Sequence, residues 1–210
     1  MMTRQKLRSE ETKQAILSAA GKLFADRGYD GVAMREIAKE AGCSHTTIYI
    51  YFKDKEVLLH ALSMPPLIEL KENFEQLVTQ SQLAPETKLI EMSMRFIRFC
   101  LLHRSIYSVV FIAKGERVDK EQQDLEINET RVALFKQLGQ VLQDVLPLPL
   151  GEERLLQFNR IYFFMLHGIV STYSHTEEPL TDIMDRLSST FETAFDALLN
   201  GFKLKMTNGG

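Results

Sequence analysis

The sequence predicts an all-α protein in which a small N-terminal domain precedes a larger helical one. Apolar residues recur every three to four positions through most of the 210 residues, as on one face of a helix. Strand signals are scarce, because no Asn-Gly or Asp-Gly turn separates two alternating runs. Two adjacent prolines, Pro65 and Pro66, lack the amide hydrogen that a helix interior needs. We therefore expect a hinge there, between domains 1–64 and 65–210.

Composition excludes several classes of protein. The chain is 45% hydrophobic and 25% charged, as in ordinary globular domains. No apolar run reaches the roughly 18 residues of a membrane span, and the N-terminus lacks the apolar core of a secretory signal. Cys43 and Cys100 lie far apart with no CxxC motif. These features favour a cytoplasmic protein with reduced thiols and no membrane partner.

Charge is distributed unevenly along the chain. The net charge is -3 for the whole protein, yet residues 1–60 hold 10 basic and 8 acidic residues, a balance of +2. The remaining residues therefore carry -5. A mildly basic end on an acidic body is typical of a protein that meets an anion at one end only.

Residues 9–60 show the pattern of a helix-turn-helix. Ser9 is a candidate cap for a first helix that ends near Gly28, and a short helix follows until Gly42. Ser44 can cap the next short helix. Glycine suits the turn between the two short helices, because the left-handed backbone conformation costs other residues about 1 kcal/mol or more. In a helix-turn-helix the second helix enters the major groove of DNA.

The helix after Ser44 is predicted to divide its side chains by face. Ile48 and Phe52 are four residues apart and should pack on the domain, which turns two strips outward, His45 with Tyr49 and Thr46 with Ile50. Such side chains suit base edges and thymine methyl groups. The flanking hydroxyls and the start of the following helix are placed to meet phosphates; these residues are Thr47, Tyr51 and Lys55.

An alternative reading makes Tyr49, Ile50 and Tyr51 simple core residues of an all-α domain. Burial of every residue from 48 to 52 would require cover on all sides of a two-turn helix. A glycine turn precedes this helix and the charged segment KDKE follows it, so one exposed face is favoured.

The segment ILSAAGKLFADRGYDGVAMREIAKEAGCSHTTIYIYFKDKEVLLHAL resembles the N-terminal DNA-binding domain of TetR-family transcriptional regulators. The resemblance covers about a quarter of the chain. It implies that Arg35 faces DNA at the start of the second helix and that His45 and Thr46 read bases. By the same resemblance Thr47, Tyr49, Tyr51 and Lys55 mainly fix phosphates, with Tyr49 sometimes touching bases. Ser44 completes the set of candidate DNA-binding residues. Ala33 departs from the family, which usually has Thr or Ser as the cap at that position.

The resemblance also implies an effector pocket and a dimer interface in the second domain. Its helices, expected at about 67–82, 86–103, 105–113, 119–146, 152–175 and 181–203, are rich in Met and Phe, which can line adaptable cavities. The alternative is an ordinary core. Candidate pocket residues are Met92, Phe96, Phe99, Cys100, His103, Tyr107, Phe111, Phe164 and His167. By resemblance, the last two helices form the dimer interface through Gly168, Ile169, Tyr173, Phe191, Phe195 and Leu198.

No enzyme motif or cofactor motif is present in the second domain. It lacks a Gly-rich phosphate loop, GxSxG and HExxH, and His167 and His175 are too far apart for one metal ion on a straight helix. We therefore expect no catalysis, no cofactor and no metal. The predicted function is a homodimeric regulator that binds palindromic operator DNA, most simply a repressor released by a small apolar or amphipathic effector.

Two rival functions stay open at this point. One is an activator or architectural DNA binder that needs no effector. The other is a helical small-molecule carrier or enzyme with a vestigial DNA-binding head, which would have no need for Tyr49, Tyr51 and Lys55.

Overall fold

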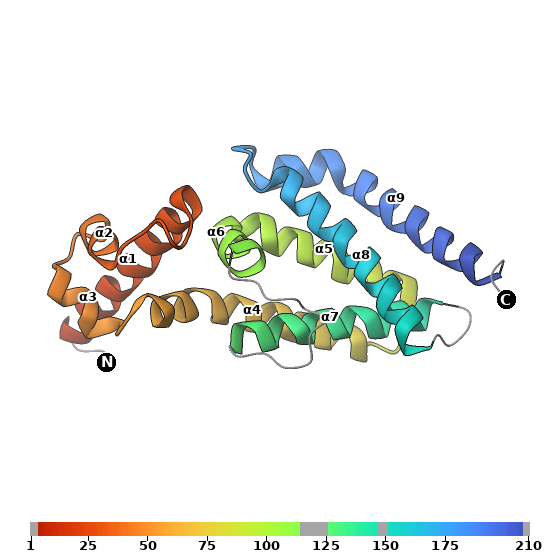
Figure 1. Cartoon of the computed structure of the whole chain (residues 1–210), viewed down its shortest axis with the longest axis horizontal. Coiled ribbons are helices and arrows are strands. Elements are labelled where there is room, and N and C mark those ends of the chain that lie inside the picture. The colour runs from red at the N-terminus through yellow and green to blue at the C-terminus, as the bar shows by residue number, and fades with distance from the viewer. Residues whose placement is uncertain (1–3, 114–125, 147–150, 208–210) are drawn as a thin grey trace. The chain divides into compact units, whose positions relative to one another are not determined.

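The computed structural model describes residues 4–113, 126–146 and 151–207, in which helices joined by turns and loops are present and no strand occurs. This confirms the predicted all-α class. In chain order the elements are α1 (Arg4–Arg27), α2 (Met34–Glu40), α3 (His45–Tyr51), α4 (Lys55–Thr79), α5 (Pro85–Leu102), α6 (Arg104–Ile106), the π-helix η1 (Tyr107–Ala113), α7 (Glu126–Val145), α8 (Glu152–Tyr173) and α9 (Leu180–Thr207) (Figure 1).

The chain forms two compact units, each made of two segments of the sequence. The first comprises Met1–Leu67 with Arg104–Glu116, and the second comprises Ile68–His103 with Arg117–Gly210. The chain passes from the first unit to the second inside α4, and the segment with α6 and η1 belongs to the first unit. The boundary at residue 64 stays a prediction.

In the first unit, α2 and α3 form a helix-turn-helix that packs on the long helix α1. The apolar side of α1 carries Ile16, Ala20 and Phe24, all fully buried, and α2 packs against α1 as well as against α3. The element α6 and the π-helix η1 also pack on α1. Two ion pairs join α1 to α2, Lys22 Nζ to Glu40 Oε1 at 2.6 Å and Arg27 Nη1 to Glu36 Oε1 at 2.8 Å.

The two turns of this unit use glycine as expected. Gly28 follows α1 with a φ of 73°, and Gly42 lies between α2 and α3 with a φ of 68°. Both values lie in the left-handed region, which a β-carbon disfavours. They are the only residues of the described chain with positive φ, so both predicted stops are confirmed.

Two sequence expectations are corrected. Ser9 does not begin the first helix, because α1 already runs from Arg4. Pro65 and Pro66 do not interrupt the next helix either, since both lie inside the continuous helix α4. Each proline removes one backbone hydrogen bond, which a helix of 25 residues buried along one side by Leu58, Leu67 and Phe74 tolerates.

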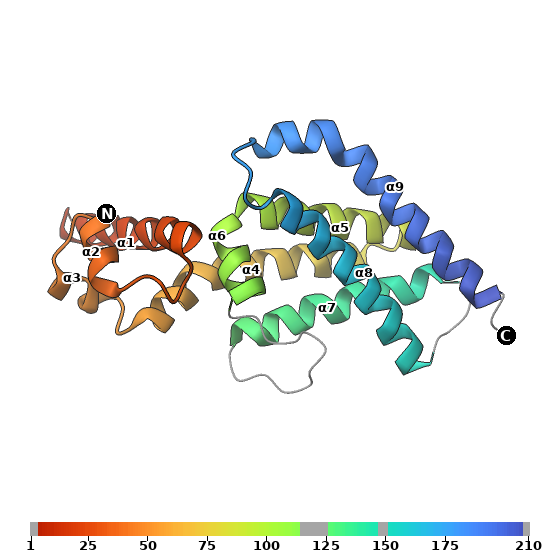
Figure 2. The same cartoon turned by 45° about the horizontal axis from the view of Figure 1, so that its top comes forward.

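The second unit is built around α5, which packs against α7, α8 and α9. In both views α8 lies between α7 and α9 (Figures 1 and 2), and it contacts both. The described helices follow the expected ranges within a few residues, but residues 119–125 of the predicted helix 119–146 lie outside the described residues. The expected helix 105–113 is instead the short α6 followed by η1.

Two buried polar contacts fix α8 in this unit. The Ser93 hydroxyl of α5 donates to the Leu89 carbonyl at 2.7 Å, so the Tyr162 hydroxyl of α8, 2.8 Å away, donates to Ser93. Burial raises the pKa of Tyr162, which keeps it a donor. Nearly one turn earlier in α8, Asn159 Nδ2 donates to the Phe135 carbonyl of α7 at 2.9 Å.

The α7–α8 contact should depend on Gly139. A β-carbon at this position would lie 2.6 Å from Asn159 Nδ2, and Asn159 is buried and held by Phe135. We expect Gly139→Ala to lower the free energy of unfolding by about 1–3 kcal/mol in denaturant titrations. Gly201→Ala is the control, because a β-carbon there meets nothing within 4 Å. Equal stability of the two variants would contradict the role of this contact.

Candidate functional site

Helix α3 begins at a complete N-terminal cap. The Ser44 hydroxyl accepts the backbone N–H of Thr47 at 3.0 Å, and the two side-chain oxygens lie 2.6 Å apart. Such a cap stabilises a helix by about 1 kcal/mol, which matters for a helix of only seven residues. The cap thus fixes where α3 starts and which side chains face outward.

The faces of α3 divide as the sequence predicts. Ile48 is fully buried and Phe52, the residue that ends the helix, is buried as well. Tyr49 is 45% exposed and Ile50 is 76% exposed. This exposure excludes the alternative that the segment is simple core. His45 and Thr46 are also exposed, so the two predicted strips form one outward surface.

Within this surface the aromatic rings of His45 and Tyr49 are in contact. The rings of His45 and Tyr49 meet edge to face, with centroids 5.2 Å apart. Thr47 and Tyr51 lie half-buried at the margins, as expected for side chains that flank the strip. The Tyr51 hydroxyl is 3.2 Å from the Ser9 hydroxyl, so it links α3 to α1. A role for Thr47 or Tyr51 in phosphate contact stays a prediction.

Lys55 has a structural role that the sequence did not reveal. Its ammonium donates to the carbonyls of Tyr29 at 2.8 Å and of Val32 at 2.9 Å, and it lies 4.3 Å from the centre of the Tyr29 ring. Lys55 therefore ties the start of α4 to the turn before α2. Its predicted contact with phosphate is untested, and two of its three donors are directed inward.

Arg35 projects from the first turn of α2 and is exposed. Ala33 caps this helix without a side-chain hydrogen bond, but the Glu36 carboxylate accepts the Ala33 N–H at 2.8 Å. That hydrogen bond and the neighbouring guanidinium of Arg27 lower the pKa of Glu36. The carboxylate of Glu36, paired with Arg27, thus stabilises the start of α2, where the expected Thr or Ser cap is replaced by Ala33.

Several predicted pocket residues lie together inside the second unit. Met92, Phe96 and Cys100 are buried on α5, and burial keeps the Cys100 thiol protonated by raising its pKa. Phe99 and His103 are half-buried with rings 5.0 Å apart. These five residues follow one another along α5 up to the residue that ends it.

Three other members of the predicted pocket are placed elsewhere. Tyr107 and Phe111 belong to the first unit, where their rings stack at 5.8 Å. Phe164 on α8 is 65% exposed, so it lies on the surface of the second unit. The predicted pocket residues therefore do not all lie in one unit, and one of them, Phe164, is exposed at the surface.

His167 of α8 lies in an aromatic cluster of the second unit. Its ring is 4.2 Å from that of Phe163 and 5.5 Å from that of Phe96. Burial lowers the pKa of His167 to about 4, and the positive charge of Arg131 on α7 adds to the effect. At neutral pH the imidazole is therefore uncharged. Arg131 was missed by sequence reasoning.

The buried pair of Arg131 and Asn128 had one sequence signal. The two residues are three apart, and Phe135 follows four later, so all three share a helix face with apolar neighbours. Both polar residues are buried in the structure. A polar residue on the apolar face of an amphipathic helix is therefore a candidate for a buried polar group, and this signal could have identified Arg131 and Asn128.

The predicted dimer residues differ in their accessibility. Gly168 is exposed, and Ile169, Tyr173 and Leu198 are half-buried. Phe191 and Phe195 are buried within the unit. The predicted dimer interface itself stays a prediction. The apolar side chains that α8 leaves exposed are Ile161 and Phe164, and α9 leaves Leu204 exposed.

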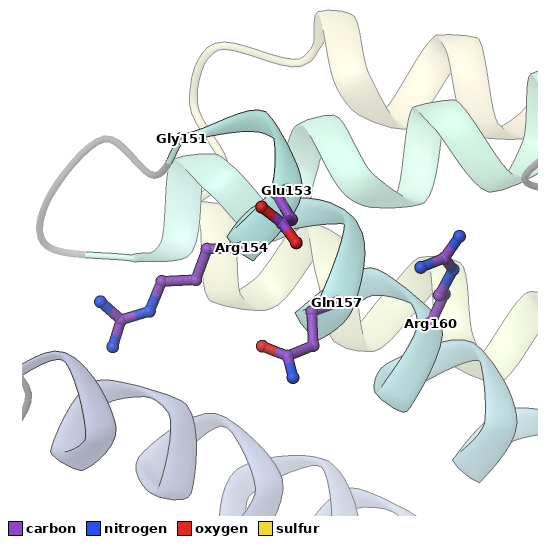
Figure 3. Close-up of a pocket in the computed structure, with 5 residues that line it drawn as sticks. All are labelled: Gly151, Glu153, Arg154, Gln157 and Arg160. Atoms are coloured by element: carbon purple, nitrogen blue, oxygen red, sulfur yellow. The ribbon is translucent and has the colours of Figure 1, made fainter.

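A surface depression of about 550 Å³ lies at the start of α8 (Figure 3). It is lined by Gly151, Glu153, Arg154, Gln157 and Arg160, and Arg154 also donates to the Lys205 carbonyl of α9 at 2.8 Å. This open polar site does not match the apolar pocket expected from the sequence.

The described residues include no cluster of three or more His, Cys, Asp or Glu side chains able to hold a metal ion. Within the same residues, no helix is long and apolar enough to cross a membrane.

The inward contacts of Lys55 predict a loss of stability on substitution. We expect Lys55→Met to destabilise the first unit by about 2 kcal/mol, because two hydrogen bonds from a charged group are lost. Amide hydrogen exchange of residues in α2 reports the effect. The neighbouring exposed Lys53→Met is the control. Unchanged exchange in Lys55→Met would show that the ammonium does not hold this turn.

The lowered pKa of His167 predicts a pH dependence of stability. An ordinary histidine takes up a proton near pH 6.5 in the unfolded chain, whereas His167 resists protonation in the folded protein until about pH 4. The contribution of neutral His167 to the free energy of unfolding is therefore fully present above about pH 6.5. It is lost as the pH drops toward 4, by about 3 kcal/mol at most. Denaturant titrations at pH 7 and pH 5 measure this loss. It should be smaller in His167→Gln and unchanged in the exposed His175→Gln; equal losses in both variants would refute the assignment.

Comparison with known proteins finds a family model that matches the segment containing α3. The model of the bacterial regulatory proteins of the tetR family matches residues 16–62, which include α2, α3 and the start of α4. A fatty acid metabolism regulator protein of Bacillus subtilis (strain 168) is 27% identical over 131 residues, 62% of this chain and 64% of that protein. The chain spans less than two thirds of the length of the curated relatives it matches.

Solved structures share the fold over most of the chain. The TetR-family regulator PfmR from Thermus thermophilus superimposes with a TM-score of 0.66 at 17% identity, covering 88% of this chain and 97% of that one. The regulator FadR from Bacillus subtilis, solved with stearoyl-CoA, gives 0.58 at 19% identity, covering 87% and 96%. The exposed strip on a capped α3 lies within the segment that the family model matches, and residues 16–62 of this chain are similar to the bacterial regulatory proteins of the tetR family.

Proposed function

We propose that this protein is a DNA-binding transcriptional regulator that uses α3 as its recognition helix. The observation that carries the proposal is the exposed strip of His45, Thr46, Tyr49 and Ile50 on a helix whose other face is buried. Imidazole and hydroxyl groups can bond to base edges in the major groove, and the isoleucine side chain can contact a thymine methyl. A solvated helix has no need of such an apolar surface.

Contacts with phosphate would come from the margins of this strip. Arg35 on α2 and the exposed basic residues Arg4 and Arg8 at the start of α1 supply positive charge. Thr47 and Tyr51 supply hydroxyl groups beside the recognition strip. Such contacts position a protein on DNA and give its binding a strong dependence on salt.

The second unit is proposed to bind an effector that releases the protein from its operator. Its interior joins the buried apolar residues Met92 and Phe96 to a few polar groups, which is the composition of small-molecule sites. The Bacillus subtilis relative is a fatty acid metabolism regulator, and a structural neighbour was solved with stearoyl-CoA. We therefore propose an effector with an acyl chain, and a protein that works as a repressor in the cytoplasm.

Release follows from a shift between two conformations. An effector that binds one conformation better lowers operator affinity by no more than its differential affinity for the two. The continuous helix α4 connects the units covalently, and the segment with α6 and η1 packs on α1. These are the elements proposed to carry the change to α3.

A homodimer is proposed to present two copies of α3 to a palindromic operator. The apolar residues Ile161 and Phe164 are exposed on α8 and lie three apart, so they share a face with Gly168. Two-fold symmetry then matches half-sites about 34–36 Å apart, or a multiple of that distance.

Substitution on the recognition strip tests the DNA-binding proposal. We expect His45→Ala with Ile50→Ala to weaken binding to a selected operator by about 10- to 100-fold in gel-shift titrations, since base contacts are lost. Binding to unrelated DNA should keep its affinity and its decrease with salt. The control is Gln82→Ala, an exposed residue after α4. Salt-independent binding, or no binding by the unmodified protein, would refute the proposal.

A charge on the exposed face of α8 tests the dimer. Phe164→Glu should convert the protein to a monomer in sedimentation velocity experiments, because an unpaired charge would be buried between subunits. Leu102→Glu is a matched control, since Leu102 on α5 is also 65% exposed. A dimer that survives Phe164→Glu would exclude this face as the interface.

A further inference from the structure

A cation and an amide are buried side by side on α7. Arg131 is only 4% exposed, and its Nη1 donates to Asn128 Oδ1 at 2.8 Å. Removal of a guanidinium from water is costly, and the interior must supply polar partners to offset the cost. Neither residue is part of the DNA-binding head or of the proposed dimer surface.

The pair faces the aromatic cluster of the second unit. Asn128, Arg131 and Phe135 share one face of α7 by their spacing, and the Phe135 ring meets Phe163 of α8 edge to face at 5.3 Å. The positive charge of Arg131 acts on His167, which packs on Phe163. Helices α5, α7 and α8 pack against one another, and the charge of Arg131 connects the polar pair to His167 in their aromatic cluster.

One donor of this pair has no acceptor among the described residues. Asn128 is buried, and its Nδ2 has no hydrogen-bond partner within the part of the chain that the structure describes. A buried donor left in this state costs about 1–3 kcal/mol. Native proteins seldom keep such a group without a reason, and a ligand acceptor beside the guanidinium would satisfy it.

We propose that Arg131 and Asn128 bind the anionic headgroup of the effector. This inference rests on the effector response proposed above and names the chemistry that the site selects. The guanidinium supplies the positive charge and the amide donor supplies a second hydrogen bond. A carboxylate or a phosphate has two oxygen acceptors in suitable geometry for both.

The aromatic side chains of the cluster would contact the apolar body of such a molecule. Phe96 and Phe163 supply aromatic surface. His167 is uncharged at neutral pH, so Arg131 provides the charge. The ligand class is therefore an amphipathic acid with an aliphatic or aromatic body. The anion is either a carboxylate, as in a free acid, or a phosphate, as in an acyl-CoA.

Calorimetric titration with matched ligands tests the proposal. The probes are decanoate, decan-1-ol and decanoyl-CoA, which share the alkyl chain and differ in the headgroup. The variants are Arg131→Gln and the nearly isosteric Asn128→Asp, with Arg98→Gln on the exposed face of α5 as control. Asn128→Asp should still fold, because the new carboxylate can accept the hydrogen bond from the Arg131 guanidinium that Asn128 accepts now.

We expect both variants to weaken binding of an anionic probe by about 10- to 100-fold and to leave decan-1-ol unchanged. Loss confined to decanoate identifies a carboxylate site, and loss confined to decanoyl-CoA identifies a phosphate site. Equal losses for the alcohol and the anions, unchanged binding in both variants, or failure of the unmodified protein to bind either anion would overturn the inference.

Gel-shift titration of the same proteins separates this inference from the proposed function. Unmodified protein that binds operator DNA but neither anion overturns the headgroup site alone. Protein that binds an anion but no DNA overturns the proposed function and leaves the site in place.

Discussion

The structure of the head depends on how α3 is held. Ser44 fixes the first turn by accepting the Thr47 N–H, and Ile48 and Phe52 fix the buried side. A seven-residue helix is unstable alone, so these contacts decide both its existence and its rotation. Because the rotation is fixed, the outward position of Ile50 and its neighbours is fixed too. The surface proposed to bind DNA is therefore a consequence of packing at one short helix.

The parts of the fold that follow local rules were predictable from sequence. Gly28 and Gly42 end helices in the left-handed conformation, and spacing placed Ile48 inside and Ile50 outside. Helix periodicity also predicted α5, α8 and α9 within a few residues of their observed bounds. The break expected at Pro65 was wrong, because burial along α4 outweighs the loss of individual backbone hydrogen bonds.

Long-range contacts were beyond single-sequence reasoning. Lys55 reads as a phosphate ligand by its position, yet its ammonium binds the carbonyls of Tyr29 and Val32, which are over twenty residues away. Spacing could not show that Phe195 is fully buried within its own unit. Arg131 looks like a solvated charge until the helices are assembled. Spacing gives the face of a helix, but only packing shows what covers it.

The central claim is that the exposed strip of α3 reads DNA sequence in a symmetric dimer. Selection of bound duplexes from a random pool, followed by sequencing, tests it most directly. The account predicts enrichment of a palindrome whose half-sites are about 10 base pairs, or a multiple, apart from centre to centre. His45→Ala should change the bases selected within each half-site. Recovery of no common sequence, or of a sequence without two-fold symmetry, would contradict the account.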